Sequence, residues 1–458
     1  MAKPSFAGEL PDLGNASGSV LTAAQEYELG RSVMQELNQA QVLLSDLIVN
    51  EYLQGIGYRL IATHGGAQPD YYFFAVKDRS INAFALPGGF VGINTGLILA
   101  TEGESELAGV IAHEIGHVQQ KHIARMYQHM GRLQLSTIAG MIASVIIATQ
   151  NPQAATGAMA ATLAGRQQAL INFTRDHERE ADYVGIQTLS KAGYDPMGMP
   201  AFFHRMQQDT RFYGNFIPEY LLTHPLTETR LMAAQSRAKA FPYKQVADSL
   251  QYHLIQARVL AFSFNSSQEA INHFAKKLQR GNYQSQIGTL YGYVLALIED
   301  GKYHEAKPYV EQLLQAYPDH PFFQLAYATI EINTNQTQKA LSRLANTLKD
   351  HPNNYPLTYT YAEWLVKTKD SATAIQFLKH KVLQKPPRPE LLNLLSSAYS
   401  QAGQPMQAHL TQAQYLKLRG DLQGAAIQLK IARKLAAPSS QQQKQIDAEI
   451  KEIQRKVS

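Results

Sequence analysis

Apolar and polar residues follow different patterns in the two halves of this chain. The pattern predicts a helix at about 22–40 and another at about 44–63. Residues 71–77 combine aromatic and β-branched side chains and predict a strand. Residues 81–94 are two short apolar runs around Pro87-Gly88-Gly89, which is typical of a strand, a tight turn and a second strand. We therefore expect a mainly helical N-terminal half with a small β-sheet.

Residues 132–170 alternate apolar and small side chains, with a break at Asn151-Pro152, and predict two helices joined by a loop. Their Ala, Gly and Met content fits ordinary core, but it also fits a lid or a membrane-facing element over a cleft. The sequence leaves these alternatives open. The longest apolar run, 138–149, is too short to span a membrane, which takes about 20 residues. Membrane contact, if any, is expected to be peripheral.

The C-terminal half repeats itself every 34 residues. Proline and alanine landmarks share this interval: Pro318, Pro352 and Pro386, and Ala306, Ala340, Ala374 and Ala408. A 34-residue period with a small residue at a fixed helical position and a proline after the second helix is the tetratricopeptide pattern. The pattern predicts repeats from about 285 to 412, with an imperfect first unit at 245–280 and a last unit from Gly420-Asp421. Such stacks bind extended or helical peptides on curved surfaces, although a plain spacer is the alternative.

Composition narrows the function classes. A chain of 458 residues is long enough for two or more domains. The net charge of +5 is too diffuse to indicate nucleic-acid binding. The chain has no cysteine, which excludes disulfides, thiolate metal sites and cysteine nucleophiles. The start, Met1-Ala-Lys-Pro-Ser-Phe6, has no apolar signal segment, so the chain is either cytoplasmic or a processed chain with an added Met.

One short motif points to metal chemistry. Residues 113–117 read His-Glu-Ile-Gly-His, within a run that favours a helix. On a helix, His113 and His117 project from one face and can bind one zinc ion. Glu114 lies beside them, placed to take a proton from a metal-bound water. The motif predicts a zinc peptidase, although an amphipathic helix can match it by chance.

A catalytic zinc site needs a third protein ligand and an open position. The segment 176–182 (Asp-His-Glu-Arg-Glu-Ala-Asp) supplies carboxylates. If it is helical, Glu178 and Asp182 share one face, so one can bind the metal while the other orients a ligand imidazole. His177 and Glu180 are expected to point elsewhere. Taken alone, the segment also fits a solvated charged helix.

Four motifs in this order resemble the M48 peptidases. These are the motif at 113–117, the carboxylate pair of Glu178 and Asp182, the segment 82–89 (Asn-Ala-Phe-Ala-Leu-Pro-Gly-Gly) and the segment 224–230 (His-Pro-Leu-Thr-Glu-Thr-Arg). The appended repeats resemble the periplasmic branch of this family, whose members act as proteases and chaperones in outer-membrane assembly. The absence of long apolar spans argues against its membrane-embedded branches.

The resemblance implies a role for each site residue. His113, His117 and Glu178 would bind one Zn²⁺, Glu114 would be the general base, and Asp182 would orient a ligand. Arg230 would stabilise the oxyanion of a tetrahedral intermediate. His224 would do the same when protonated, or it would be a fourth zinc ligand that closes the enzyme at rest, which the resemblance favours. A turn histidine before Pro225 is the alternative for His224, and His122 is expected to be structural.

Substrate binding is expected at the predicted hairpin. Asn82, Ala83 and Phe84 would belong to an exposed strand edge that pairs with an extended peptide through main-chain hydrogen bonds. The resemblance implies unfolded or stalled outer-membrane β-barrel proteins as clients, contact with the barrel assembly machinery through the repeats, and a periplasmic location. Two alternatives stay open: a non-proteolytic holdase or adaptor with a silent metal site, and a cytoplasmic peptidase.

The fold class expected from these patterns is α+β. We expect an irregular lead-in at 1–20 and an M48-like, zincin-type metallopeptidase domain at 21–240. An all-α tetratricopeptide solenoid would follow at 245–437, and a polar, solvated helical tail at 438–458.

Overall fold

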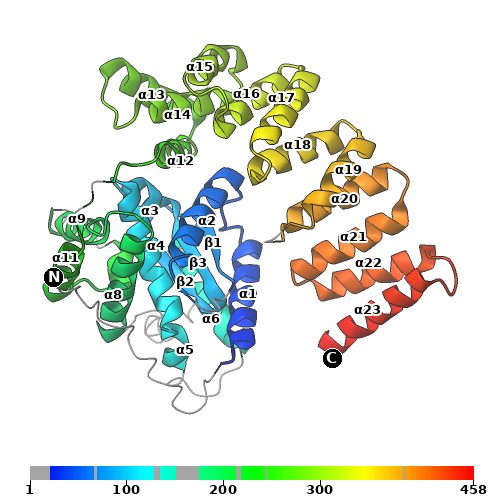
Figure 1. Cartoon of the computed structure of the whole chain (residues 1–458), viewed down its shortest axis with the longest axis horizontal. Coiled ribbons are helices and arrows are strands. Elements are labelled where there is room, and N and C mark those ends of the chain that lie inside the picture. The colour runs from blue at the N-terminus through cyan, green and yellow to red at the C-terminus, as the bar shows by residue number, and fades with distance from the viewer. Residues whose placement is uncertain are drawn as a thin grey trace, which may run out of the picture. The chain divides into compact units, whose positions relative to one another are not determined.

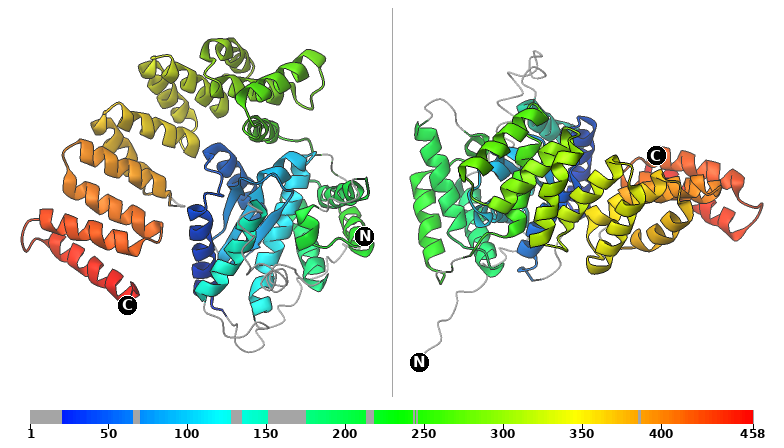
Figure 2. Two further views of the ribbon diagram at one scale, coloured as in Figure 1. Left: turned by 180° about the vertical axis from the view of Figure 1, so that it is seen from behind. Right: turned by 90° about the horizontal axis from the view of Figure 1, so that it is seen from above.

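The structure is a computed structural model that describes residues 21–65, 70–127, 135–150, 175–212, 218–242, 244, 246–384 and 387–457. It divides into two compact units, Met1–Ser263 and Phe264–Ser458, and each is described by itself (Figures 1 and 2). No helix among the described residues has the length and apolar character needed to cross a membrane.

The first unit surrounds a small sheet with helices (Figure 1). Its elements are α1 (Ala23–Gln39), α2 (Leu47–Ile61), β1 (Tyr72–Val76), β2 (Ala83–Leu86), η1 (Pro87–Gly89), β3 (Phe90–Asn94), α3 (Thr95–Ala100), α4 (Glu104–Gln119), α5 (His122–Tyr127), α6 (Leu135–Gln150), α8 (Arg175–Lys191), α9 (Gly198–Phe212), α10 (Glu219–Thr223), α11 (Glu228–Lys239) and α12 (Leu250–Ala261). The predicted helices at 22–40 and 44–63 and the strand at 71–77 are confirmed within a few residues.

The sheet has the order β1-β3-β2, with β1 parallel and β2 antiparallel to β3. The predicted strand–turn–strand is confirmed, and η1 is its turn. Gly88 and Gly89 have φ of 76° and 90°, a region that side chains disfavour. At Gly88 there is also no room, because an added Cβ would lie 2.4 Å from Cα of Tyr27.

Successive residues of β1 pack on opposite faces of the sheet, as the alternation of a strand requires. Phe74 belongs to a core that also contains Val33 of α1 and Ile138 of α6. Phe73 lies against α2, where an added Cβ at Gly57 would lie 2.1 Å from its ring. The burial of α6 favours the core alternative for the first of the two helices predicted at 132–170; the second falls outside the described residues.

The second unit is a series of helix pairs (Figure 2). Its helices are α13 (Ser267–Arg280), α14 (Gln286–Glu299), α15 (Tyr303–Ala316), α16 (Pro321–Asn333), α17 (Thr337–Asp350), α18 (Tyr355–Lys367), α19 (Ser371–Lys381), α20 (Pro389–Gln401), α21 (Pro405–Leu418), α22 (Leu422–Leu435) and α23 (Gln441–Val457). The α+β class followed by an all-α repeat unit is therefore confirmed.

The 34-residue period reflects two requirements of each helix pair: a small residue where the helices touch and a residue with positive φ in the turn. The four alanines of the pattern are buried in α15, α17, α19 and α21, where a small side chain suits a close helix contact. The residue that reverses the chain between paired helices has a positive φ each time: Gly301, Asn335, Lys369 and Gly403. Pro386 lies outside the described residues.

Two predicted boundaries need correction. Residues 245–263 belong to the first unit, because α12 is bound to it: Tyr252 donates to the carbonyl of Thr101 at 2.8 Å, and Arg258 to Asp46 at 2.7 Å. The polar tail is a helix, but it is solvated on one face only. On its other face Ile446, Ile450 and Ile453 are buried against α22, so α23 ends the apolar core of the repeats.

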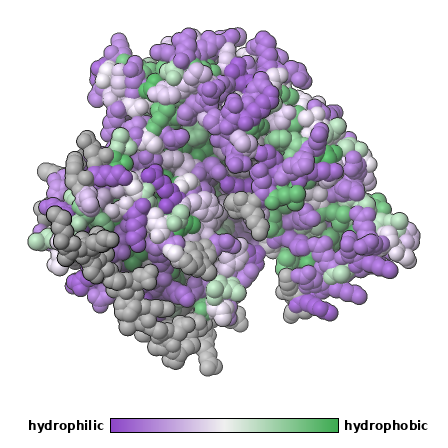
Figure 3. Space-filling view, viewed as in Figure 1, coloured by the Kyte–Doolittle hydropathy of each residue, from purple (hydrophilic) through white to green (hydrophobic). Residues whose placement is uncertain are grey.

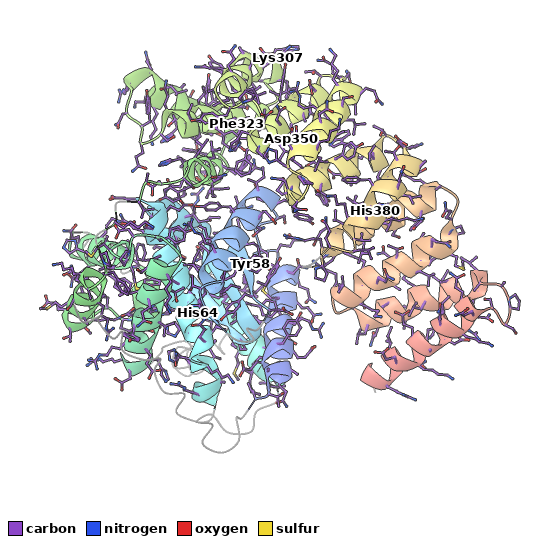
Figure 4. All side chains as sticks on the ribbon, viewed as in Figure 1. Tyr58, His64, Lys307, Phe323, Asp350 and His380 are labelled. Atoms are coloured by element: carbon purple, nitrogen blue, oxygen red, sulfur yellow. The ribbon has the colours of Figure 1, made fainter. Side chains whose placement is uncertain are left out.

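His320 makes the repeat unit sensitive to acid. Its Nδ1 accepts from the backbone N–H of Phe322 at 3.3 Å, its ring packs 4.5 Å from that of Phe323 (labelled in Figure 4), and Nε2 has no hydrogen-bond partner among the described residues. Burial, with the nearby His351, lowers the pKa of His320 to about 4. The folded state therefore favours the neutral ring, and its stability is lost as the pH falls from about 6.5 towards 4.

We expect His320→Asn to remove part of this acid sensitivity, because Asn also caps a helix but does not titrate. Between pH 7 and pH 4.5 the wild type should lose on the order of 1–2 kcal/mol more than the variant, a discounted figure because the ring is partly solvated. Denaturant unfolding of the repeat unit over this pH range measures the difference. The exposed His304→Asn is the control. Equal slopes for His320→Asn and wild type would contradict the assignment.

Candidate metal centre

The motif at 113–117 lies on α4, a helix whose residues from Leu107 to His117 are all buried. Its N-terminal cap Gly103 has no side chain to offer, so Asp248 accepts the N–H of Glu104 at 2.7 Å instead. Leu107, Val110 and Ile111 fill the surrounding core. The helix therefore forms because its apolar residues are buried all round, and the polar motif is carried into the interior with them.

Glycines let α8 approach α4 closely. An added Cβ at Gly116 would lie 2.9 Å from the carbonyl oxygen of Ala181, and one at Gly185 would lie 3.1 Å from the backbone nitrogen of His113. The far part of α8 is held by Thr188, whose hydroxyl lies 2.7 Å from Nε2 of His64 (labelled in Figure 4). This packing brings the carboxylates of α8 to the histidines of α4.

Four side chains converge in the interior: His113, His117, Glu178 and His224. All are buried, and their donor atoms lie within 4.8 Å of one another. Nε2 of His113 is 3.0 Å from Nε2 of His117 and 3.5 Å from Oε2 of Glu178, while Nδ1 of His224 is 3.1 Å from Oε1 of Glu178. Tetrahedral zinc ligands at about 2.0–2.1 Å from the ion stand roughly 3.3 Å apart, so donor types and spacing both fit zinc.

The charges around this group favour a cation. Burial opposes the charged form of His113, but hydrogen bonds to Asp182 and Glu178 and the charges of these carboxylates raise its pKa to about 9. Burial also opposes the charge of Glu178, yet His224 and Arg230 hold the pKa of this carboxyl well below its usual range. Burial and the neighbouring His113 lower the pKa of His117. The group is therefore an ionised carboxylate among imidazoles, the composition of a metal site.

Asp182 and Arg230 hold the ligands from behind. Oδ1 of Asp182 lies 2.9 Å from Nδ1 of His113. Arg230 places Nε 2.6 Å and Nη2 2.9 Å from the two oxygens of Asp182. Its Nη1 is 2.6 Å from Oε2 of Glu178 and 3.2 Å from the carbonyl oxygen of Pro225. Every nitrogen of this guanidinium is thus engaged with the carboxylates of Asp182 and Glu178 or with the carbonyl that follows His224.

Glu114 differs from the other carboxylates of the site. It is fully buried, and among the described residues it has no well-formed hydrogen bond, although a weak contact from the backbone of Ala85 slightly opposes the rise of its pKa. Burial raises its pKa. A buried carboxylate so weakly paired beside a cation site is suited to accept a hydrogen bond from water and to take its proton.

His224 follows α10 and points into the group of donors. Its backbone N–H donates to the carbonyl of Tyr220 at 2.7 Å, and the rings of His224 and Tyr220 lie 4.8 Å apart. Nε2 of His224 is 3.5 Å from Oε1 of Glu114. The ring therefore stands between the two glutamates, Glu114 and Glu178, where a fourth ligand or a water molecule would be.

The residues predicted to bind substrate lie beside this group. Among the described strands, β2 pairs only with β3, so it is an edge strand. Ala83 and Phe84 are in β2, while Asn82 precedes it and is buried. The side chain of Asn82 donates to Glu219 of α10 at 3.0 Å, which indicates a structural part for this residue.

The sequence did not assign a function to three further residues near the metal group. Tyr220 is buried, and its hydroxyl has no partner among the described residues. His122 and Glu180 form a row with His117: Nδ1 of His122 lies 2.8 Å from Nδ1 of His117, and Nε2 of His122 lies 3.0 Å from Oε2 of Glu180. The spacing of five residues from His117 to His122 was the only signal for this row, and Tyr220 had none.

Comparison with known proteins agrees with this geometry. Residues 48–238 match the model of peptidase family M48, and residues 297–357 match a tetratricopeptide repeat model. The fold and the site thus define a peptidase of the His-Glu-x-x-His class with appended repeats.

Relatives resolve the family further. The chain is 36% identical over 446 residues to the "Putative beta-barrel assembly-enhancing protease" of Vibrio cholerae, covering 97% of this chain and 92% of the relative. It is 32% identical to the "Beta-barrel assembly-enhancing protease" of Escherichia coli, covering 98% and 93%. It is also 30% identical over 158 residues to the "Mitochondrial metalloendopeptidase OMA1" of Arabidopsis thaliana, covering 34% and 29%. The chain belongs to the M48 peptidases, in the family of the beta-barrel assembly-enhancing proteases.

Proposed function

We propose that this protein is a zinc-dependent endopeptidase and chaperone-like factor in the quality control and assembly of outer-membrane β-barrel proteins. The convergence of His113, His117, Glu178 and His224 carries the enzymatic part of the proposal. The names of the relatives support the biological part. A protein with this task would work in the periplasm, and we infer that location together with peripheral membrane contact.

Each residue of the site would have a role in peptide hydrolysis. His113, His117 and Glu178 would hold the zinc ion, which when bound acts as a Lewis acid and lowers the pKa of water to about 7. Glu114 would take the proton of the attacking water and pass it to the nitrogen of the leaving amine. Its weakly paired oxygens and raised pKa suit both transfers.

We infer a supporting part for Arg230 in place of the predicted oxyanion contact. Its nitrogens are already engaged with Asp182, Glu178 and the carbonyl of Pro225. Releasing them to meet a substrate would leave buried carboxylates unpaired, which costs about 3–5 kcal/mol. Arg230 would therefore keep the carboxylates of Glu178 and Asp182 ionised and in place.

We propose that His224 closes the site at rest. Its ring lies 3.1 Å from Glu178 and 3.5 Å from Glu114. The ring therefore fills the space that a substrate carbonyl and an attacking water would need. Opening would require α10 to move. An enzyme that meets folded proteins throughout its life benefits from such a closed state.

Substrate would bind along the outer edge of β2, from Ala83 onwards. Main-chain pairing there recognises any extended segment and suits clients rich in β-strands. The repeat unit would add a second contact with clients or with the barrel assembly machinery. Its exposed apolar side chains, which include Leu418, Ile427 and Leu435, fit such contacts, and Figure 3 shows hydrophobic positions scattered among hydrophilic ones.

Replacing Glu114 by Gln tests the enzymatic proposal. The variant should keep one zinc per chain, because Glu114 is not a ligand, and lose at least about 100-fold in peptide cleavage. Zinc content and cleavage of an unfolded β-barrel protein measure the two properties. Cleavage at the wild-type rate would contradict the assignment. If Glu114→Gln still supports barrel assembly in cells at the wild-type level, the holdase or adaptor function carries the biological role.

Replacing His224 by Ala tests the closed state. We expect zinc to stay bound by three ligands and peptide cleavage to rise about tenfold or more, because the position facing Glu114 is vacated. Initial rates on a short peptide, with zinc content measured in parallel, give the answer. A fall in rate at unchanged zinc content would show that His224 acts in catalysis instead.

Backbone methylation of the substrate tests strand pairing. A peptide methylated at a nitrogen two residues from the cleaved bond cannot donate to the edge of β2, and we expect its kcat/KM to fall by about tenfold or more. The same peptide methylated far from the cleavage point is the control. Equal cleavage of both peptides would exclude this mode of binding.

A further inference from the structure

His122 lies directly behind His117, on the side away from the other zinc donors. Its Nδ1 is 2.8 Å from Nδ1 of His117, and the rings are 4.9 Å apart at an angle of 74°. The ring of His122 is fully buried. Burying an imidazole costs free energy unless its polar atoms are paired, so its place next to a ligand needs an explanation.

The chain is bent to bring His122 there. The α4 helix ends at Gln119 and α5 begins at His122. Between them Lys121 has a φ of 51°, in a region that a residue with a Cβ seldom adopts. Strain of this kind persists where the surrounding structure enforces it, and functional sites are common places for it.

The contact to His117 fixes where the protons are. Nε2 of His117 faces the other donors, at 3.0 Å from Nε2 of His113, so it must be free of hydrogen to bind a metal. The neutral ring of His117 then carries its hydrogen on Nδ1 and donates it to Nδ1 of His122. His122 must in turn carry its hydrogen on Nε2.

Glu180 accepts this second hydrogen. Its Oε2 lies 3.0 Å from Nε2 of His122 and 3.0 Å from Nη1 of Arg125. The side chain of Glu180 is 40% exposed, so the row runs from the buried ligand to the surface. Burial opposes the charge of Glu180, but the hydrogen bonds from His122 and Arg125 keep its pKa low, and it remains an acceptor.

A second metal site does not fit these residues. The ring of His177 stacks on that of His122 at 4.3 Å with an angle of 20°. Nearly parallel rings direct their lone pairs into parallel planes and not toward one ion. Within the described part of the chain, the donors grouped closely enough for a metal are those of the site already described.

We propose that His122 and Glu180 are positioning residues that fix the tautomer and orientation of His117. The inference rests on the proposed zinc site. Both ligand histidines would then have a partner at Nδ1. The partner of His113 is Asp182, and the partner of His117 is His122, which Glu180 holds in turn. Such partners raise the basicity of a ligand imidazole, and losing one costs about 10–100-fold in metal affinity.

Two substitutions of Glu180 test the proposal in the full-length protein. Glu180→Leu removes the acceptor and should weaken zinc binding about 10–100-fold in a chelator competition. Glu180→Gln keeps an oxygen that accepts from His122 and should remain within about threefold of wild type. Asp176→Asn, an exposed carboxylate on the same helix paired with Arg179, is the control and should bind as wild type does.

A spectroscopic readout separates positioning from a structural effect. In ¹⁵N-histidine NMR of the zinc-loaded protein, the Nδ1–H of His117 should be in slow exchange in wild type and Glu180→Gln, and broadened in Glu180→Leu. Equal zinc affinity and equal spectra for wild type and Glu180→Leu would overturn the proposal, as would an equal loss in Glu180→Gln and Glu180→Leu. Absence of zinc binding by the wild type would instead overturn the proposed function.

Discussion

The close packing of α4 against α8 is the constraint on which the rest of the site depends. An added Cβ would lie 2.9 Å from the carbonyl oxygen of Ala181 at Gly116 and 3.1 Å from the backbone nitrogen of His113 at Gly185, so either would be tight. A bulky residue at either glycine would push the helices apart. The carboxylate–imidazole distances of 2.9–3.5 Å at Asp182 and Glu178 would then open, and the proposed metal site would lose the carboxylate of Glu178. Backbone contact is thus the source of the geometry, and the ligand side chains follow from it.

Burying so many charged groups opposes folding, and their mutual pairing offsets that cost. Each buried ion loses several kcal/mol of hydration, which only well-formed ion pairs and hydrogen bonds return. Arg230 supplies these for Asp182 and Glu178 together, while Glu180 and Arg125 carry the outer end of the row at the surface. Glu114 differs, because its contact with the backbone of Ala85 is a weak one and burial dominates its pKa. This weakly paired carboxylate is the one that we propose as the general base.

The sequence predicted the periodic parts of this protein and missed what depends on geometry. The spacing of His113 and His117 implies a shared face, and the 34-residue period implies paired helices, because both follow from local repetition. The end of the first unit was misplaced, since α12 looks like a repeat helix, and the contacts of Tyr252, Gln256 and Arg258 that bind it to the first unit leave no pattern in the sequence. The tail looked solvated because three isoleucines among many polar residues form one buried stripe. Arg230 was recognised as a site residue, but its engagement with Asp182 is a three-dimensional fact that no motif records.

The start of the edge strand and the segment bearing His224 are joined by hydrogen bonds. Glu219 of α10 accepts from Ser80 at 2.8 Å and from Asn82 at 3.0 Å, and the N–H of Tyr220 donates to the carbonyl of Ile81 at 3.0 Å. Each such bond is worth about 0.5–1.5 kcal/mol net, and somewhat more where it meets a charge. Moving α10 far enough to withdraw His224 therefore costs a few kcal/mol. A peptide that adds several main-chain bonds along β2 would gain a similar amount, so the two proposed steps, substrate binding at the edge and withdrawal of His224, would be energetically matched.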